Sequence, residues 1–233
     1  MDPPKPALKI VRISSHDQLD ELIDLANDAF IDDPVMDLMV PGRHEHPESA
    51  RAMWWMTINE EYGKKGTVML AARREEDGEQ GKFLAFAIWQ RVGSSEVAQC
   101  WQGDNWNKQR ARLGTMWANF YYFVLRQAGP GISLEKAIDA GAAVERAYKF
   151  YPTERWRLSL LAVSPKCQRT GIGKRLLQWG LDRCEEEGVP ATLESSIAGR
   201  PLYEKMGFRE IGSVSFNEGK SSMPAMLRPV GEI

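Results

Sequence analysis

The chain has 233 residues, 43% of them hydrophobic and 27% charged, and its formal net charge at pH 7 is −2. A chain of this length can bury one substantial core, so we expect a single domain over residues 1–233. The near-neutral charge gives no general attraction to nucleic acid or to an anionic membrane, and no apolar run approaches the ~20 residues of a membrane span. Composition therefore predicts a globular protein with neither nucleic acid nor membrane as a partner.

Three cysteines, Cys100, Cys167 and Cys184, form an odd number at no metal-ligand spacing. We interpret them as reduced thiols that fill space, which is typical of a cytoplasmic or nuclear protein. The first residues, MDPPKPALK, lack the apolar core of a signal peptide. We therefore expect a cytoplasmic location, with the nucleus as the alternative, and no metal.

The first ninety residues predict helices between strands. Apolar positions recur at helical spacing from Leu19 to Ala26, and Ser14 or Ser15 can cap that helix. The expected elements, in chain order, are a strand (Lys9–Ile13), this helix, a Pro- and Asp-containing loop (Asp32–His46), a helix (Glu48–Tyr62) and two strands (Val68–Ala72 and Phe83–Trp89) joined by a polar turn.

Residues 93–153 differ from the rest because they are helical in pattern and rich in aromatic side chains. A helix is predicted over Asn105–Gln127, and glycine and proline at residues 128–131 end it. Ser133 can then open a second helix that reaches Lys149. We expect most of the aromatic side chains here to form a small core of their own: Trp101, Trp106, Trp117, Tyr121, Tyr122 and Phe123.

The second half alternates strands with helices, which predicts a mixed α/β sheet. Trp156–Val163 ends in an apolar stretch, Leu160-Leu161-Ala162-Val163, so we expect it to be a central strand that is buried on both faces. The elements that follow are a helix (Ile172–Glu185), a strand (Ala191–Ser195), a helix (Gly199–Lys205) and two strands (Phe208–Phe216 and Ala225–Pro229).

The turn Gln168–Lys174, between the central strand and the next helix, has the composition of an anion site. Gly171 and Gly173 carry no side chain, so backbone N–H groups can approach a ligand closely. The first N–H groups of a helix lack internal partners, and the helix dipole favours negative charge there. Arg169, Lys174 and Arg175 add positive charge. The turn is therefore predicted to bind a phosphate or pyrophosphate.

Two common phosphate motifs are excluded at this turn. A Walker A loop needs Ser or Thr after its lysine, whereas Lys174 is followed by Arg175. A dinucleotide fingerprint would need glycine at position 176, which is Leu176.

The residues around the turn resemble motif A of the GNAT superfamily of acetyl-CoA-dependent N-acetyltransferases. The pattern is Val163-x-Pro165-x-x-Gln168-Arg169-x-Gly171-x-Gly173, followed by Leu176-Leu177. A second segment, Leu202-Tyr203-Glu204-Lys205-Met206-Gly207-Phe208, is similar to motif B of the same superfamily. The resemblance covers residues 156–212.

This resemblance implies an α/β (α+β) fold with a GNAT-type mixed central sheet of about six to seven strands. The sheet is expected to be splayed between strands 4 and 5 and flanked by helices. The acetyl-CoA-binding core would lie at about residues 156–212, with a helical insertion at about 93–153. The family usually has a short turn in place of such an insertion, and often Asn at the position of Ser196.

The resemblance also implies how acetyl-CoA is held. Its pantetheine arm would lie in the gap between the splayed strands and pair with backbone groups of Leu161 and Val163. An N–H near Leu161 or Ala162 would stabilise the oxyanion of a tetrahedral intermediate. The implied cofactor contacts are Leu161, Ala162, Val163, Gln168, Arg169, Thr170, Gly171, Ile172, Gly173, Lys174 and Ser196.

Two side chains are candidates for proton transfer. Tyr203 matches the family's general acid, which protonates the leaving thiolate; alternatively it only packs at the start of its helix. Glu194, at the end of the fifth strand, is the candidate base, because an alkylammonium with a pKa near ~10.4 must lose a proton before it can attack. Alternatively, Glu194 is a surface or salt-bridged glutamate.

The expected function is transfer of an acetyl group from acetyl-CoA directly to a primary amine of a small molecule. Two alternatives are a non-catalytic acyl-CoA-binding or interaction protein, and an acetyltransferase for protein lysines or N-termini. One or two aromatic side chains of the insertion would then line an acceptor pocket. A monomer or a homodimer is expected.

Overall fold

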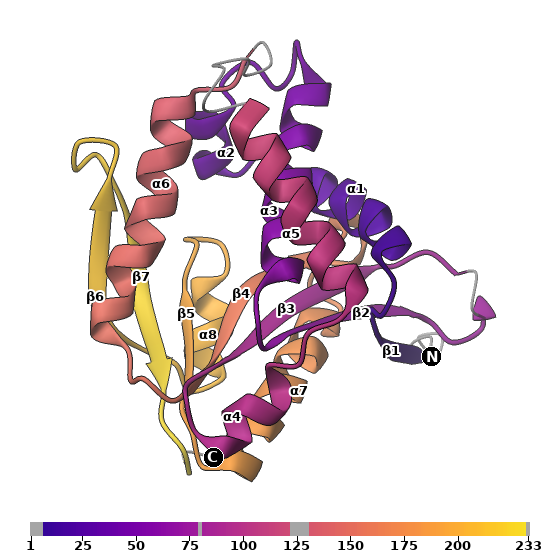
Figure 1. The fold of residues 1–233 in the computed structure, drawn as a ribbon, viewed down its shortest axis with the longest axis vertical. Coiled ribbons are helices and arrows are strands. Elements are labelled where there is room, and N and C mark those ends of the chain that lie inside the picture. Colours follow the sequence, from indigo (N-terminus) through magenta and orange to yellow (C-terminus); the bar gives the residue numbers. More distant parts are fainter. Residues whose placement is uncertain (1–6, 79–80, 122–130, 232–233) are drawn as a thin grey trace, which may run out of the picture.

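The computed structural model describes residues 7–78, 81–121 and 131–231. Seven strands form one sheet in the order β1-β2-β3-β4-β5-β7-β6, in which only β4 and β5 are parallel neighbours (Figure 1). The strands are β1 (Leu8–Arg12), β2 (Thr67–Arg74), β3 (Ala85–Val92), β4 (Arg155–Val163), β5 (Ala191–Glu194), β6 (Arg209–Phe216) and β7 (Ser221–Arg228). The predicted mixed sheet is confirmed.

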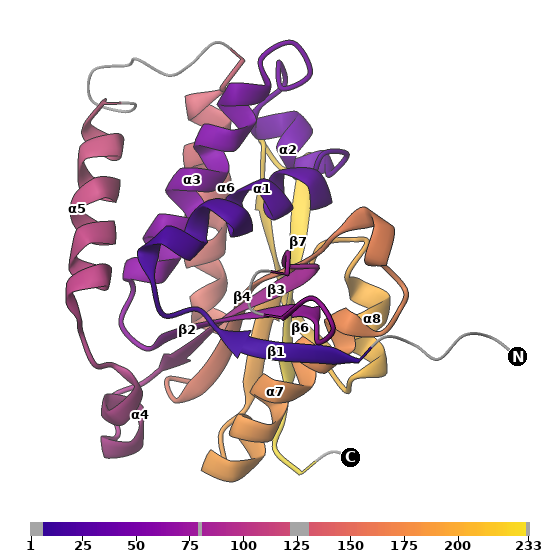
Figure 2. The same cartoon turned by 90° about the vertical axis from the view of Figure 1, so that its right-hand side faces the viewer.

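Helices cover both faces of the sheet. In Figure 2, α1 and α3 lie on one face and α7 lies on the other. The helices are α1 (Leu19–Ala29), α2 (Pro34–Met39), α3 (Pro47–Gly63), α4 (Glu96–Trp101), α5 (Trp106–Asn119), α6 (Leu134–Ala147), α7 (Ile172–Glu187) and α8 (Arg200–Lys205). Short 3-10 turns occur at His16–Gln18, Tyr148–Phe150 and Pro165–Cys167.

Side chains alternate between the two faces along the strands, and this alternation builds two cores. Phe86 and Ile88 of β3 pack with α1 and α3, whereas Ala87 and Trp89 of the same strand pack with α7. The contact with α7 is close: a Cβ added to Gly180 would collide with the ring of Trp89. Glycine at position 180 therefore allows α7 to lie directly on β3, which fixes where α7 begins.

The central strand contains a β-bulge. Ile88 pairs with Leu160 and Trp89 pairs with Leu158, so Ser159 is an extra residue on β4. A bulge reverses the alternation of the strand beyond it. Accordingly, Leu158 and Leu161 both belong to the core beside α7, while Leu160 packs on the opposite side.

The sheet opens between β4 and β5, as predicted. The two strands pair only over residues 156–158 of β4 and 191–193 of β5. Residues 159–163 of β4 pair with β3 on one side and, within the described residues, with no strand on the other. Residues 159–161 are only partly buried, although they lie in the central strand of the sheet. The expectation that this strand is buried throughout is therefore wrong at the opening.

The segment between β3 and β4, residues 93–154, packs at several places on the rest of the fold. Helix α5 lies along α3, and α6 lies along β6 (Figure 1). The three alanines of α6 at 140, 143 and 147 form a small core with Val214 and Phe216 of β6. Trp101 of α4 packs edge-on against Trp156 and Trp179, so it joins the core beside α7.

The aromatic side chains of α5 do not form the core that was expected. This helix buries Lys108, Ala111 and Thr115 against α3, and turns its large residues outward. Trp106 is 74% exposed and Trp117 is 68% exposed. Tyr121 is also exposed, and Tyr122, Phe123 and the end of the predicted helix lie outside the described residues. The prediction was wrong for Trp106, Trp117 and Tyr121, because α5 packs against α3 through another of its faces.

One helix was missed in the first half. The loop predicted over Asp32–His46 contains α2, which Asp33 caps by accepting a hydrogen bond from Val35 N–H at 2.8 Å, with Pro34 in the first turn. Aspartate at the cap and proline at the first helical position are favourable start signals. None of the described helices is both long enough and apolar enough to cross a membrane.

The three cysteines are free, in agreement with the sequence. Burial raises the pKa of the Cys184 thiol to about 12, and Cys100 is exposed. Since the thiolate is the reactive form, we expect maleimide at pH 8 to label Cys100 rapidly and Cys184 only after unfolding. Mass spectrometry of native and guanidinium-unfolded protein measures this, and equal labelling of both residues in the native state would contradict it.

Candidate active site

The turn between β4 and α7 has the uncapped helix start that an anion site requires. Gly171 is the first residue before α7 and has a φ of 91°, a left-handed conformation that favours glycine. No side chain caps the helix, so its first N–H groups remain available to a ligand. Arg169 and Lys174 are exposed beside them. Arg175 instead turns to β1, where it donates to the carbonyl of Leu8 at 3.2 Å.

The two glycines of the turn have different environments. Gly171 is exposed, and a Cβ added there would meet nothing within 4 Å. Gly173 is buried, and a Cβ there would lie 3.3 Å from Val163 and 3.8 Å from Leu202. Gly173 therefore allows α7 to pack closely on β4 and α8. Gly171 borders open space at the start of α7.

Other predicted residues of the turn hold its shape. The Thr170 hydroxyl donates to the carbonyl of Cys167 at 2.6 Å. The side-chain amide of Gln168 donates to the carbonyl of Val163 at 3.3 Å. Ile172 is buried in the core beside α7. These contacts tie the turn to the end of β4, so the turn and the opened sheet form one continuous surface.

The backbone of β4 faces the gap at the two predicted positions. Ser164 N–H donates to the carbonyl of Leu84, which precedes β3. Along a strand, successive residues direct their backbone N–H and C=O groups to opposite sides, so those of Val163 and Leu161 point away from β3. Trp156 N–H donates to Pro190 on the β5 side. Without the bulge at Ser159, the groups of Leu161 and Val163 would point at β3. Ala162 lies between them and is buried beside α3.

Tyr203 lies on α8, on the same side of the sheet as α7. Its side chain is buried in the core beside α7, and its ring meets Phe208 edge-on. Burial raises the pKa of Tyr203, so the phenol keeps its proton at neutral pH. Ser196 supports the approach to α8 by accepting a hydrogen bond from Gly199 N–H at 3.1 Å.

Glu194 ends β5 and lies in a buried ion pair. Its Oε2 atom accepts from Arg157 Nη2 at 2.8 Å and from Nε at 3.2 Å. Both side chains are nearly inaccessible, with 6% of Glu194 and 4% of Arg157 exposed. Glu194 is therefore a salt-bridged glutamate, which was one of the predicted alternatives. Its role as a base stays a prediction.

Three further residues of this cluster were not found from the sequence. Glu61, at the end of α3, lies 3.8 Å from Arg157 Nη1. Ser159 Oγ accepts from the same nitrogen at 2.6 Å. The Tyr151 hydroxyl donates to the carbonyl of Leu193 at 2.7 Å. The one available signal was an arginine in an otherwise apolar central strand, because a buried arginine requires partners.

The two candidate proton-transfer residues lie on opposite faces of the sheet. Tyr203 is packed among residues that contact α7, whereas Glu194 joins Arg157 and Glu61 beneath α3.

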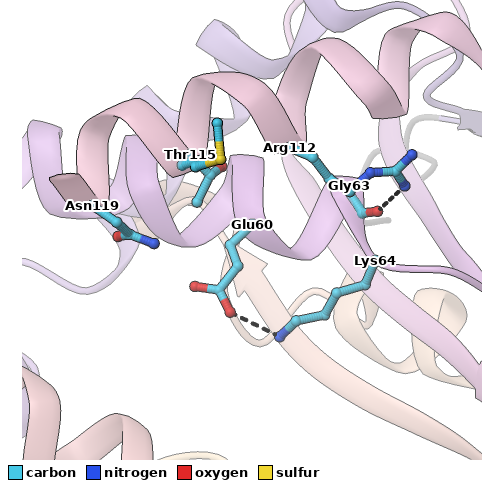
Figure 3. A pocket seen from close by; sticks show the side chains of 7 residues that line it. Glu60, Gly63, Lys64, Arg112, Thr115 and Asn119 are labelled. Atoms are coloured by element: carbon cyan, nitrogen blue, oxygen red, sulfur yellow. Dashed lines mark hydrogen bonds and ion pairs between the residues drawn. The ribbon is translucent and has the colours of Figure 1, made fainter.

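A hollow of about 400 Å³ lies between α3 and α5 (Figure 3). Lys64 lines it and binds both Glu60, at 3.3 Å, and Glu61, at 2.6 Å. The remaining lining residues are Gly63, Arg112, Thr115, Met116 and Asn119. Among the described residues, no three His, Cys, Asp or Glu side chains gather as a metal ion would require.

Comparisons with known proteins agree on one family. Residues 137–227 match the acetyltransferase (GNAT) domain. A 44-residue stretch is 46% identical to the probable acyltransferase SID5 of Ajellomyces capsulatus, and covers 19% of this chain and 32% of that protein. A 70-residue stretch is 34% identical to an uncharacterized N-acetyltransferase of Schizosaccharomyces pombe, and covers 30% of this chain and 28% of that protein. The matches thus span less than a third of either relative.

The fold has a counterpart among solved structures. A crystal structure described as histone acetyltransferase HPA2 and related acetyltransferase, from Corynebacterium glutamicum, superimposes with a TM-score of 0.62 at 19% identity. The superposition covers 97% of this chain and 98% of that one.

A mixed sheet that opens between two parallel strands, with an uncapped helix start beyond the opening, defines a fold shared with acetyltransferases. Within this fold, residues 137–227 are the part of the chain that matches the GNAT acetyltransferase domain. The resemblance seen in the sequence is therefore confirmed, both in the family and in the fold class.

Proposed function

We propose that the protein is an N-acetyltransferase that moves an acetyl group from acetyl-CoA directly to a primary amine of a small molecule. The observation that carries this proposal is the open side of β4. Beyond Leu158 this strand pairs with no other strand on one side within the described residues, and the uncapped start of α7 lies at its end. A pantetheine arm can add to such an edge as a strand would, with its pyrophosphate at the helix start.

The turn would bind the anionic part of the cofactor. Arg169 and Lys174 provide charge beside the N–H groups that follow Gly171. The pantetheine amides would pair with the outward groups of Leu161 and Val163. Ser196, which already accepts a hydrogen bond from Gly199, has its hydroxyl proton left to donate.

In the reaction, the amine nitrogen attacks the thioester carbonyl, so a C–N bond forms as the C–S bond breaks. The amine must lose a proton, which Glu194 would accept on the face beneath α3. The departing thiolate gains a proton, which Tyr203 would donate from the face beside α7. The raised pKa of Tyr203 suits this role, because an acid must hold its proton at the operating pH. The backbone N–H near Leu161 or Ala162 would stabilise the oxyanion.

One assay distinguishes the proposed function from its two alternatives. Release of CoA is measured against a panel of small primary amines, lysine peptides and peptides with free N-termini. Turnover with small amines supports the proposal, and turnover with peptides alone would favour a protein acetyltransferase. Binding of acetyl-CoA without any turnover would favour a non-catalytic acyl-CoA-binding protein.

The cofactor site can be tested at Gly171. We expect Gly171→Val to weaken acetyl-CoA binding by ~10-fold or more, because a branched side chain strains the left-handed backbone and fills the open space before the helix. Calorimetry measures this affinity.

The matched control is Gly188→Val at the opposite end of α7. Gly188 has a φ of 65° and also faces open space, so the local strain is similar. Equal acetyl-CoA affinity in the Gly171→Val and Gly188→Val proteins would remove this turn from the cofactor site.

A further inference from the structure

We propose that Glu61 and Glu194 together form a buried subsite for the ammonium group of the acceptor, which makes Glu61 a specificity-determining residue. The proposal rests on the proposed acetyltransferase function. Glu61 is on α3, far in sequence from both motifs, and reaches the opening of the sheet from the face opposite Tyr203.

The first observation is a pair of buried oxygens without hydrogen bonds. Glu61 Oε2 and Glu194 Oε1 are both inaccessible to solvent, and neither has a hydrogen-bond partner. A buried carboxylate oxygen with no donor is costly, so each such oxygen in a native protein calls for a missing donor. Both oxygens belong to carboxylates that contact the same guanidinium, that of Arg157.

Two hydroxyls lie beside these carboxylates, that of Ser159 next to Glu61 and that of Tyr151 next to Glu194, but neither donates to Glu61 Oε2 or Glu194 Oε1 in this structure. The Tyr151 hydroxyl donates to the Leu193 carbonyl, and Lys64 donates to the other oxygen of Glu61. Arg157 donates to Ser159 Oγ and to the other oxygen of Glu194.

The second observation is how the two carboxylates share their cations. Arg157 contacts both Glu61 and Glu194, and Lys64 binds Glu61 at 2.6 Å. Each carboxylate thus turns one oxygen to a cation and leaves the other without a hydrogen bond.

Glu61 is charged at neutral pH. Burial acts to raise the pKa of Glu61, but Arg157 and Lys64 outweigh it and hold that pKa below its ordinary value. A primary ammonium could donate to both of these oxygens, since it has three N–H donors and forms charge-assisted hydrogen bonds with carboxylates.

The third observation is access. Ser159, Leu160 and Leu161 are partly exposed where the sheet opens, and Ser159 contacts Arg157 directly. An amine that enters at these residues would reach the carboxylates before it reaches a thioester lying along β4. Glu61 would hold the ammonium, and Glu194 would accept its proton.

The test uses Glu61→Gln, which keeps the shape and removes the charge. Loss of one charged hydrogen bond should raise KM for n-hexylamine by ~10-fold or more and leave KM for acetyl-CoA within about twofold. The matched control is Glu60→Gln, because Glu60 also pairs with Lys64 but makes no contact with Arg157 and is 57% exposed. We expect this control to change neither KM by more than about twofold. Equal KM values for n-hexylamine in the two variants would overturn the proposal.

A binding measurement separates this proposal from the proposed function. Wild-type protein saturated with CoA should bind n-hexylamine more tightly than 1-hexanol, and Glu61→Gln should lose this preference. If the wild type turns over no amine but shows this preference, the proposed function fails and the subsite stands. A wild type that binds 1-hexanol as tightly as n-hexylamine overturns the subsite, whether or not the variant folds.

Discussion

Replacing Tyr203 with phenylalanine should lower kcat by ~10²–10⁴-fold, the usual contribution of a positioned acid, with little change in acetyl-CoA affinity. The ring is buried and packs against Phe208, and phenylalanine retains both properties. Only the hydroxyl proton is lost, and burial keeps that proton in place by raising the pKa of Tyr203. The thiolate would then have to leave without a donor.

The measurement is single-turnover acetylation of the best amine, in which chemistry limits the rate. Tyr62→Phe is the matched control, because Tyr62 is also buried but lies in the core beneath α1 and α3. It should leave the rate unchanged. A Tyr203→Phe protein that acetylates at the wild-type rate and melts at the wild-type temperature would mean that Tyr203 is a packing residue.

Replacing Arg157 with methionine should lower the free energy of unfolding by about 3–5 kcal/mol. The side chain is 4% exposed, and its loss leaves Glu194 buried without its hydrogen-bonding cation. Burial acts to lower the pKa of Arg157, but Glu194 and Glu61 outweigh it and raise that pKa, so the arginine is charged at every accessible pH. Most of the lost free energy of unfolding comes from leaving buried carboxylates without a cation, rather than from losing the attraction of the ion pair itself.

Urea unfolding at pH 7 measures this change. Arg51→Met is the control, since Arg51 pairs with Asp20 and Asp24 on the surface and exposed pairs contribute little. Adding Glu194→Gln to Arg157→Met should restore part of the stability, because it removes one stranded charge. Unchanged stability in the single Arg157→Met variant would show that the cluster is open to water.

Local sequence determined the half of the site that contains the turn and α7. The apolar run before Pro165, the glycine at position 171 and the apolar stripe of α7 all act within a few residues of one another. Backbone conformation and helix termini depend on such short-range chemistry, so the turn could be predicted from the sequence. Tyr203 could be proposed for the same reason, because it lies within a short motif on one helix.

Tertiary structure alone decided the other half. Glu61, Arg157 and Glu194 come from α3, β4 and β5, and only the pairing of the sheet and the packing of α3 bring their side chains together. The bulge at Ser159, which turns the backbone of Leu161 and Val163 toward the gap, depends on the register between β3 and β4. Which side chains of α5 are exposed depends on how this helix packs against α3. Burial and partners are properties of contacts between distant segments, and therefore the folded chain was needed to show which charges share one site.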